Sequence, residues 1–105
     1  MKARPVVQRP LARQDVDQAI DRYIAEGRRG AALEFIQALE EAYAHIGRFP
    51  ASGSPRIGHE VELPGLRSWP LTAFPYLVFY VEREDRIDVW RVLHSRRDIP
   101  TWLQV

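Results

Sequence analysis

Residues 76–100 read YLVFYVEREDRIDVWRVLHSRRDIP, and this stretch decides the fold. Two apolar runs, residues 76–83 and 87–93, flank the polar residues 84–86, and this spacing predicts a β-hairpin. The second run ends in a polar cluster with a histidine, two adjacent arginines and an aspartate, and Pro100 then prevents further strand pairing. Because a strand end has no structural need for two neighbouring arginines, we expect the functional surface of the chain here.

The chain before this hairpin predicts a short strand and two helices. Residues 6–9 form a short edge strand that Pro10 ends. Apolar residues then recur at helical intervals from Leu11 and again over residues 31–46, and the Gly-Arg-Arg-Gly segment 27–30 marks a tight joint between the two helices. Two amphipathic helices joined so closely form a helical hairpin, whose apolar side must pack on another surface.

Residues 47–65 are rich in glycine and proline and predict a loop, with a short extended stretch at residues 61–63 as an alternative within it. A further strand follows at residues 66–71, and Pro70 and Pro75 favour an edge position or a bulge for it. The prediction is an α+β fold in one domain of 105 residues. Its order is an edge strand, a two-helix hairpin and a three-stranded antiparallel meander, with the helices on one face of the sheet.

Composition limits the class of protein. A chain of 105 residues with 46% hydrophobic residues can bury a core without a metal ion or disulfides. Cysteine is absent, so thiol chemistry and disulfides are excluded. No apolar run approaches the roughly 20 residues that cross a bilayer, and the first residues do not resemble a signal peptide. We therefore expect a soluble protein of the cytoplasm.

The formal net charge is +1, which does not by itself predict a nucleic-acid partner. The basic residues are one lysine and fourteen arginines. Arginine is the side chain that forms planar, two-pronged contacts with phosphates and carboxylates, which favours a binding role. A GC-rich genome would produce the same preference, so the composition alone decides nothing.

Five segments in chain order resemble the RelE/ParE superfamily of toxins. They are DVDQAIDRYIA at 15–25, FPASGSPR at 49–56, GLRSWP at 65–70, YLVFY at 76–80 and RVLHSRRDIP at 91–100. The last resembles the C-terminal signature Arg-Val-Leu-His-x-x-Arg-Asp-Ile-Pro of the ParE branch. The resemblance implies the same fold and a type II toxin–antitoxin system. It also implies inhibition of DNA gyrase, which the toxin traps on cleaved DNA, and an antitoxin that is encoded beside the toxin.

The alternative function is that of the RelE branch, which cuts messenger RNA on the ribosome. Such cleavage needs an acid, a base and positive charge on the phosphate, and His94 with the arginines could supply them. The resemblance to that branch fails at three features: Leu77 stands where it has an arginine, Pro100 stands where it has a tyrosine, and the only lysine is Lys2. Trp102 cannot exchange the required proton. We therefore predict a protein that acts by binding and is not an enzyme.

Two binding surfaces are predicted. The surface for the target lies around the end of the last strand, and it comprises Arg67, His94, Arg96, Arg97 and Trp102. The surface for the antitoxin combines the edge strand, which can accept an added strand, with the apolar side of the helical hairpin. Its predicted residues are Val6, Val7, Ile20, Tyr23, Ile24, Phe35 and Leu39.

Structural roles are open alternatives for the tail. His94 can hydrogen-bond the backbone at a strand end instead of contacting a target. Arg96 can pair with Asp98 across a turn, which is worth little when exposed. Residues 98–100 can begin a last helical turn that contains Trp102, with proline near its start. The adjacent arginines are easier to explain as a binding feature.

No cofactor or metal is predicted. The three histidines, His45, His59 and His94, fall on different elements, with no cysteine or carboxylate cluster that joins them. No glycine loop of the phosphate-binding type is present. The predicted partners are the antitoxin, in a hetero-oligomer, and gyrase. No membrane and no sequence-specific nucleic-acid binding is expected.

Overall fold

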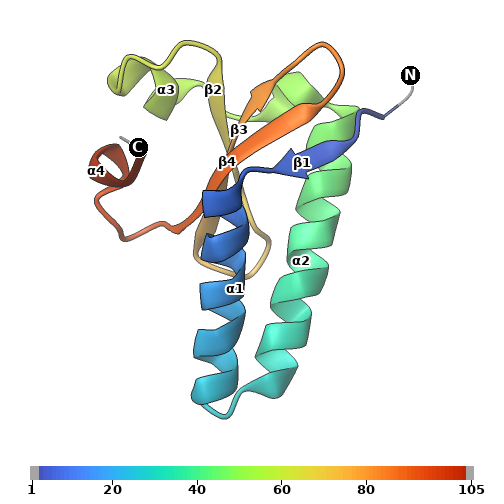
Figure 1. The fold of residues 1–105 in the computed structure, drawn as a ribbon, viewed down its shortest axis with the longest axis vertical. Coiled ribbons are helices and arrows are strands. Elements are labelled where there is room, and N and C mark those ends of the chain that lie inside the picture. Colours follow the sequence, from blue (N-terminus) through green and yellow to red (C-terminus); the bar gives the residue numbers. More distant parts are fainter. Residues whose placement is uncertain (1–2, 104–105) are drawn as a thin grey trace.

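The computed structural model describes residues 3–103, which form one four-stranded sheet with helices on both faces (Figure 1). The strand order is β1-β4-β3-β2, and β1 runs parallel to β4 while the other neighbours are antiparallel. The strands are β1 (Val6–Gln8), β2 (Leu66–Pro70), β3 (Tyr76–Glu82) and β4 (Ile87–His94). The predicted α+β class, edge strand and meander are confirmed, and β2 lies at the second edge as its prolines indicated.

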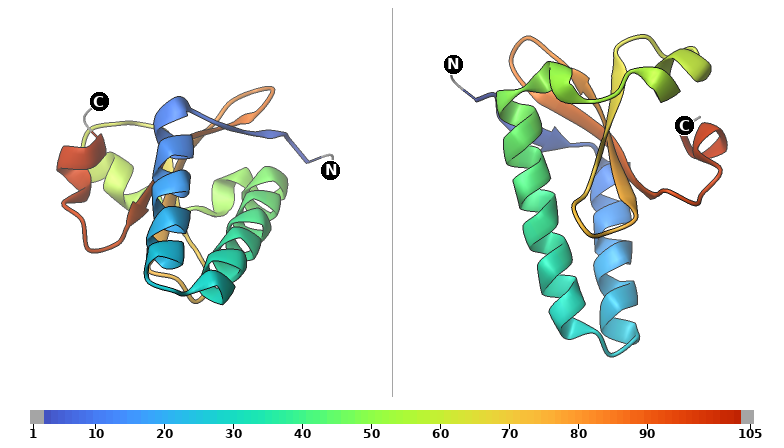
Figure 2. Two further views of the ribbon diagram at one scale, coloured as in Figure 1. Left: turned by 60° about the horizontal axis from the view of Figure 1, so that its bottom comes forward. Right: turned by 180° about the vertical axis from the view of Figure 1, so that it is seen from behind.

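The helical hairpin consists of α1 (Pro10–Ala25) and α2 (Arg29–Arg48). Proline at the first position of α1 costs no hydrogen bond, because that N–H has no partner within a helix. Gly27 ends α1 with a φ of 73°, and the N–H groups of Gly27 and Arg28 close on carbonyls of the last helical turn. The two helices lie side by side and project beyond the sheet at their joint (Figure 2).

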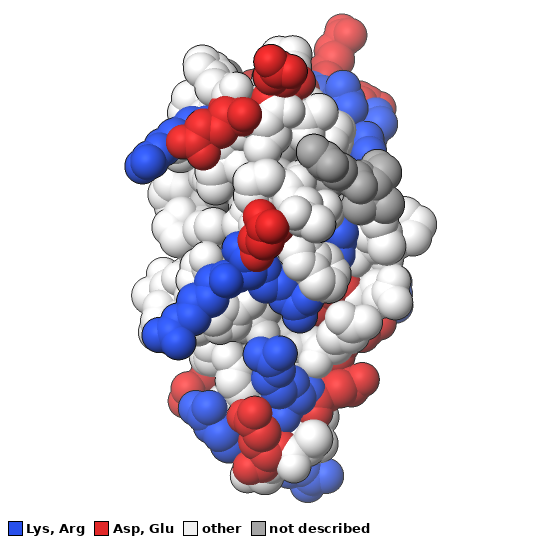
Figure 3. All heavy atoms as spheres, turned by 90° about the vertical axis from the view of Figure 1, so that its left-hand side faces the viewer, with Lys and Arg blue, Asp and Glu red and all other residues white. Residues whose placement is uncertain are grey.

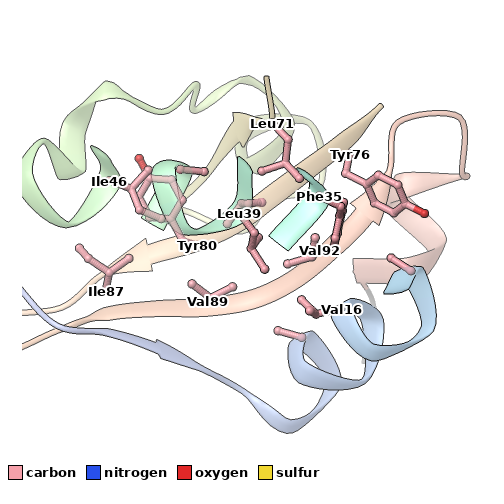
Figure 4. Packing of buried hydrophobic residues seen from close by; sticks show 14 of the residues in the cluster. Val16, Phe35, Leu39, Ile46, Leu71, Tyr76, Tyr80, Ile87, Val89 and Val92 are labelled. Carbon is pink, nitrogen blue, oxygen red and sulfur yellow. The ribbon is translucent and has the colours of Figure 1, made fainter. Parts of the chain in front are cut away.

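The first face of the sheet packs against α1 and α2 (Figure 4). Phe35 and Ile46 of α2 are fully buried there against Tyr80 of β3 and Val89 of β4. The Phe35 ring meets the Tyr76 ring edge to face, with ring centroids 5.1 Å apart. The predicted placement of the two long helices on one face is thereby confirmed.

The second face is covered by α3 (Arg56–Glu60) and α4 (Ile99–Leu103). Its buried residues are Leu66, Phe79, Val81, Leu93, Ile99 and Leu103. The alternation of β3 serves both faces, since successive side chains of a strand point to opposite sides. Among residues 3–103, no helix is long and apolar enough to cross a membrane.

The segment between α2 and β2 differs from the prediction of a plain loop. It contains a short 3-10 helix, η1 (Pro50–Ser52), as well as α3. The alternative of an extended stretch at residues 61–63 is wrong, because these residues leave α3 in a turn with Glu62 at a φ of 58°. At Gly58 an added Cβ would lie 2.4 Å from the Leu66 carbonyl oxygen, so glycine allows this close packing of α3 on β2.

A β-bulge interrupts β4 opposite the middle of β3. Phe79 pairs with Arg91 and Tyr80 pairs with Val89, so that Trp90 is the extra residue. Trp90 packs with the cluster on the second face, while Arg91 reaches α1. The bulge therefore lets two consecutive residues of β4 serve different purposes.

Candidate functional site

The candidate site begins where β4 ends. His94 is the last residue of β4 and pairs with Tyr76. A turn follows, closed by a hydrogen bond of 3.0 Å from the Arg97 N–H to the His94 carbonyl. Asp98 then precedes α4 and accepts a hydrogen bond of 2.7 Å from the Thr101 hydroxyl. The alternative of a last helical turn that contains Trp102 is thereby confirmed.

A buried ion pair holds this end of the chain against α1. The Arg91 guanidinium donates to both carboxylate oxygens of Asp15, at 2.8 and 2.7 Å, and both side chains are 8% exposed. The same carboxylate accepts the Val92 N–H at 3.0 Å, which satisfies β4 beyond the end of its pairing with β1. Arg91 also donates to the Trp102 carbonyl at 2.8 Å, so α1, β4 and α4 meet at one side chain.

Beside this ion pair, five side chains line a hollow that is open to solvent: Arg22, His94, Arg96, Arg97 and Trp102. We call this the basic hollow. It adjoins a smaller cavity of about 90 Å³, which shares Arg22, His94 and Arg97 with it and is also lined by Tyr76. On the side of the molecule that carries α4, basic groups gather across the middle and lower surface, with carboxylates between them (Figure 3).

The three arginines of the basic hollow are not neutralised internally. Arg22, Arg96 and Arg97 form no salt bridge with any carboxylate of residues 3–103. The alternative of an Arg96–Asp98 pair is therefore wrong. Arg97 instead lies over the Trp102 ring, with its Cζ 4.2 Å from the ring centroid. Its guanidinium N–H groups donate to no residue of 3–103 and are available to a ligand.

The surroundings of His94 favour its neutral form. Burial, and then the positive charges of Arg22, Arg96 and Arg97, lower the pKa of the His94 imidazole from its usual 6.5. Its Nδ1 accepts a hydrogen bond of 3.1 Å from the Arg96 N–H, so the neutral ring carries its proton on Nε2. The backbone hydrogen bond that sequence analysis left open is present. In this tautomer Nε2 can donate a hydrogen bond but cannot take up a proton.

Arg67 is not brought to the basic hollow. It lies on β2, at the opposite edge of the sheet from the β1 strand, and pairs with Tyr80. Its guanidinium donates to the Gly53 carbonyl at 2.8 Å. Gly53 in turn donates its N–H to the buried Tyr80 hydroxyl at 3.0 Å. An added Cβ on Gly53 would lie 2.4 Å from that hydroxyl, so Arg67 belongs to a tightly packed loop contact.

The residues predicted to bind an antitoxin divide by exposure. Tyr23, Phe35 and Leu39 are at most 7% exposed and pack in the core between the hairpin and the sheet, so they present very little surface. Val7 on the edge strand and Ile24 on α1 are 48% and 47% exposed. The remaining two, Val6 and Ile20, are half-buried against the same core.

Arg22 is the residue of the basic hollow that sequence analysis missed. It lies in the last turn of α1, one and two turns after Gln18 and Asp15 on one face of the helix. This spacing is visible in the sequence, but it acquires meaning only once α1 is known to run beside the C-terminal segment. Among residues 3–103, no three histidine, aspartate or glutamate side chains are grouped as a metal site would require.

Comparison with known proteins agrees with this fold. Among solved structures, a chain of the "Chromosomal ParDE TA system from P. aeruginosa" matches with a TM-score of 0.73 and 20% sequence identity, over 90% of this chain and 98% of that chain. A search of the curated proteins gives no match. The fold is thus shared with a chain of that system. The family model described as "ParE toxin of type II toxin-antitoxin system, parDE" matches residues 6–99, and the chain belongs to this family.

Proposed function

We propose that this ParE-family toxin inhibits growth by binding DNA gyrase, that it acts without catalysing a reaction, and that the basic hollow with α4 contacts the target. The observation that carries the proposal is the family match over residues 6–99. The hollow supports the location, since Arg96 and Arg97 have no carboxylate partner in the described part of the chain and Trp102 is 40% exposed. Arginine and tryptophan are the side chains that most often dominate binding energy at interfaces.

The residues at the nuclease positions argue against RNA cleavage. Leu77 is an apolar side chain that packs with the cluster on the second face of the sheet, and Pro100 is part of α4. The basic lone pair of neutral His94 lies on Nδ1 and accepts the Arg96 N–H, so it is not free for a general base. A neutral imidazole among three arginines is nonetheless the one feature that favours a messenger RNA endonuclease, so both activities must be measured.

Two assays separate these functions. Purified toxin is added to gyrase with relaxed plasmid and ATP, and separately to a translation extract with a defined messenger RNA. We expect loss of supercoiling with accumulation of cleaved plasmid, and intact messenger RNA. Codon-specific cuts in the extract together with normal supercoiling would reverse the assignment. As a control, the double change Arg13→Ala with Arg48→Ala removes two exposed arginines outside the hollow and should inhibit gyrase like the unchanged protein.

We further propose that an adjacently encoded antitoxin binds the open edge of β1 and the exposed apolar side chains near it and on α1. Support comes from the edge position of β1 and from the exposure of Val7 and Ile24. Expression of the toxin alone should stop growth, and coexpression of the neighbouring reading frame should restore it. Ile24→Asp should weaken that rescue, whereas Leu33→Asp, at a side chain that is 69% exposed on α2, should not. Unchanged growth on expression of the toxin alone would remove the basis of this proposal.

A further inference from the structure

The arginines of the basic hollow differ from the arginines of the ion pairs in forming no salt bridge with a carboxylate of residues 3–103. They converge from two separate parts of the chain, Arg22 from α1 and Arg96 and Arg97 from the turn before α4. The whole chain carries a net charge of only +1, so this positive field is local. We propose that the basic hollow binds the backbone phosphates of a nucleic acid, independently of base sequence and without cutting the strand. The proposal concerns the same surface as the proposed function and names the chemical group that its arginines contact, and it holds whether or not gyrase is the target.

The geometry of the donors fits phosphate oxygens. Arg97 lies over the Trp102 ring, and its guanidinium N–H groups donate to no other residue of 3–103, so they are available for two hydrogen bonds to phosphate oxygens. Arg96 donates its backbone N–H to His94, and its side chain makes no hydrogen bond to another residue of 3–103. His94 adds a neutral donor, because its proton lies on Nε2. Two neighbouring phosphates could therefore each receive more than one donor.

A nucleic-acid backbone fits the hollow better than an acidic peptide does. A peptide needs an apolar slot for an anchoring side chain, and besides Trp102, over which Arg97 lies, the hollow is lined only by charged and polar side chains. The cavity with an apolar lining lies elsewhere, between Leu11, Trp90 and Leu103. Backbone phosphates require only positive charge and N–H donors, and these are what the hollow presents.

The test is fluorescence anisotropy with a short labelled duplex of random sequence and purified toxin, at several salt concentrations. For three phosphate contacts, the logarithm of the binding constant should fall with the logarithm of salt concentration with a slope of about −2.7. The triple change Arg22→Gln, Arg96→Gln and Arg97→Gln should bring the slope close to zero and weaken binding at ~50 mM salt by about a hundredfold. Duplex RNA should behave like DNA, because only the phosphates are contacted.

The matched control is the triple change Arg13→Gln, Arg29→Gln and Arg48→Gln, which removes the same charge from exposed positions outside the hollow. It should bind within about twofold of the unchanged protein at ~50 mM salt, with a slope near −2.7. If both triple variants lose the same affinity, or if the unchanged protein does not bind, the proposal is overturned. Displacement of the duplex by an oligoglutamate peptide at a lower concentration than by an oligonucleotide of equal charge would assign the hollow to an acidic protein partner instead.

Two further variants keep the test decisive if the glutamine triple variant fails to fold. Arg96→Gln changes an exposed side chain that makes no described contact, and it should reduce the slope by about 1. The triple change of Arg22, Arg96 and Arg97 to lysine retains the charges and should keep the slope near that of the unchanged protein. A slope that Arg96→Gln leaves unchanged would contradict the proposal.

Discussion

Two arginine-rich regions lie at opposite ends of β4, and they differ in whether their arginines have carboxylate partners. Near the start of β4, Arg9 and Arg83 both reach the Asp88 carboxylate, at 2.9 and 3.2 Å. At its end, Arg96 and Arg97 meet no carboxylate of residues 3–103. In the first region two arginines pair with one carboxylate, while the arginines of the second region pair with none in residues 3–103. The difference shows that the neighbouring carboxylate, and not the residue type, decides whether an arginine is paired within the fold.

The region around Asp88 shows how pairing with arginines affects a buried carboxylate. Burial alone would raise the pKa of Asp88, but hydrogen bonds from Arg9, Trp90 and Arg83 outweigh it and lower the pKa. Arg9 also lies over the Trp90 ring, 4.3 Å from its centroid. Both arginines there are paired with Asp88. Within the basic hollow, Arg97 lies over the Trp102 ring, and Arg22, Arg96 and Arg97 form no salt bridge with a carboxylate of residues 3–103.

The ion pair of Asp15 with Arg91 joins α1, β4 and α4 between these two regions of β4, and its removal should have the largest effect. Arg91→Ala leaves a buried carboxylate without its partner and releases the Trp102 carbonyl, so we expect the free energy of unfolding to fall by about 3 to 5 kcal/mol. Urea denaturation measures this change. Arg86→Ala is the control, since its salt bridge with Asp85 is exposed and should contribute less than about 1 kcal/mol.

A small effect of Arg91→Ala would mean that the pair is not the connection between α1 and α4. The double change Asp15→Ala with Arg91→Ala sharpens the test. If the single losses come mainly from an unpaired buried charge, the double variant should be more stable than their sum predicts. Additive losses would contradict that account.

Removal of the free arginines should act on function instead of stability. We expect the double change Arg96→Ala with Arg97→Ala to abolish growth inhibition, because a desolvated two-pronged arginine contact can contribute roughly 2 to 4 kcal/mol to a complex. The thermal midpoint and the affinity for the antitoxin should stay close to those of the unchanged protein. All three are measured on the same preparation. A well-folded double variant that still stops growth would place the target site away from this tail, and lost antitoxin binding would indicate a shared interface.

How much of this structure could be predicted from the sequence depends on whether local or long-range interactions determine it. The strands, the hairpin helices and the stop at Gly27 are set by local periodicity and turn residues, and they were predicted closely. The helix α3 has only five residues, too few to establish a helical period, so its segment was predicted as a loop. The predicted ends of helices and strands differ from the observed ends by one or two residues where a proline or glycine fixes the end.

Long-range pairings were beyond such local signals. Asp15 and Arg91 are 76 residues apart in the chain, and neither neighbourhood indicates the other. Arg22 joins the basic hollow for the same reason, through the packing of α1 beside the tail. The tail arginines were found because they are adjacent in sequence. Phe35 and Leu39 were predicted to bind the antitoxin but are buried in the core. An apolar helix face predicts burial, but it does not show whether the sheet of the same chain or a partner protein packs against it.

The smallest effect expected is on the titration of His94, which reports the field of the unmatched arginines directly. Because burial and those arginines lower its pKa, the midpoint followed by NMR of the imidazole should lie below 6.5. The contribution of His94 to the free energy of unfolding is then fully present above about pH 6.5, and it is lost as the pH falls through the lowered value. Replacement of Arg96 and Arg97 by glutamine should raise the midpoint, while replacement of Arg9 and Arg83, which pair with Asp88 near the other end of β4, should leave it unchanged. Bound duplex DNA should raise the midpoint as well, because phosphates would cancel the same field. A midpoint that responds equally to both pairs of substitutions would mean that the two regions do not differ in the way proposed.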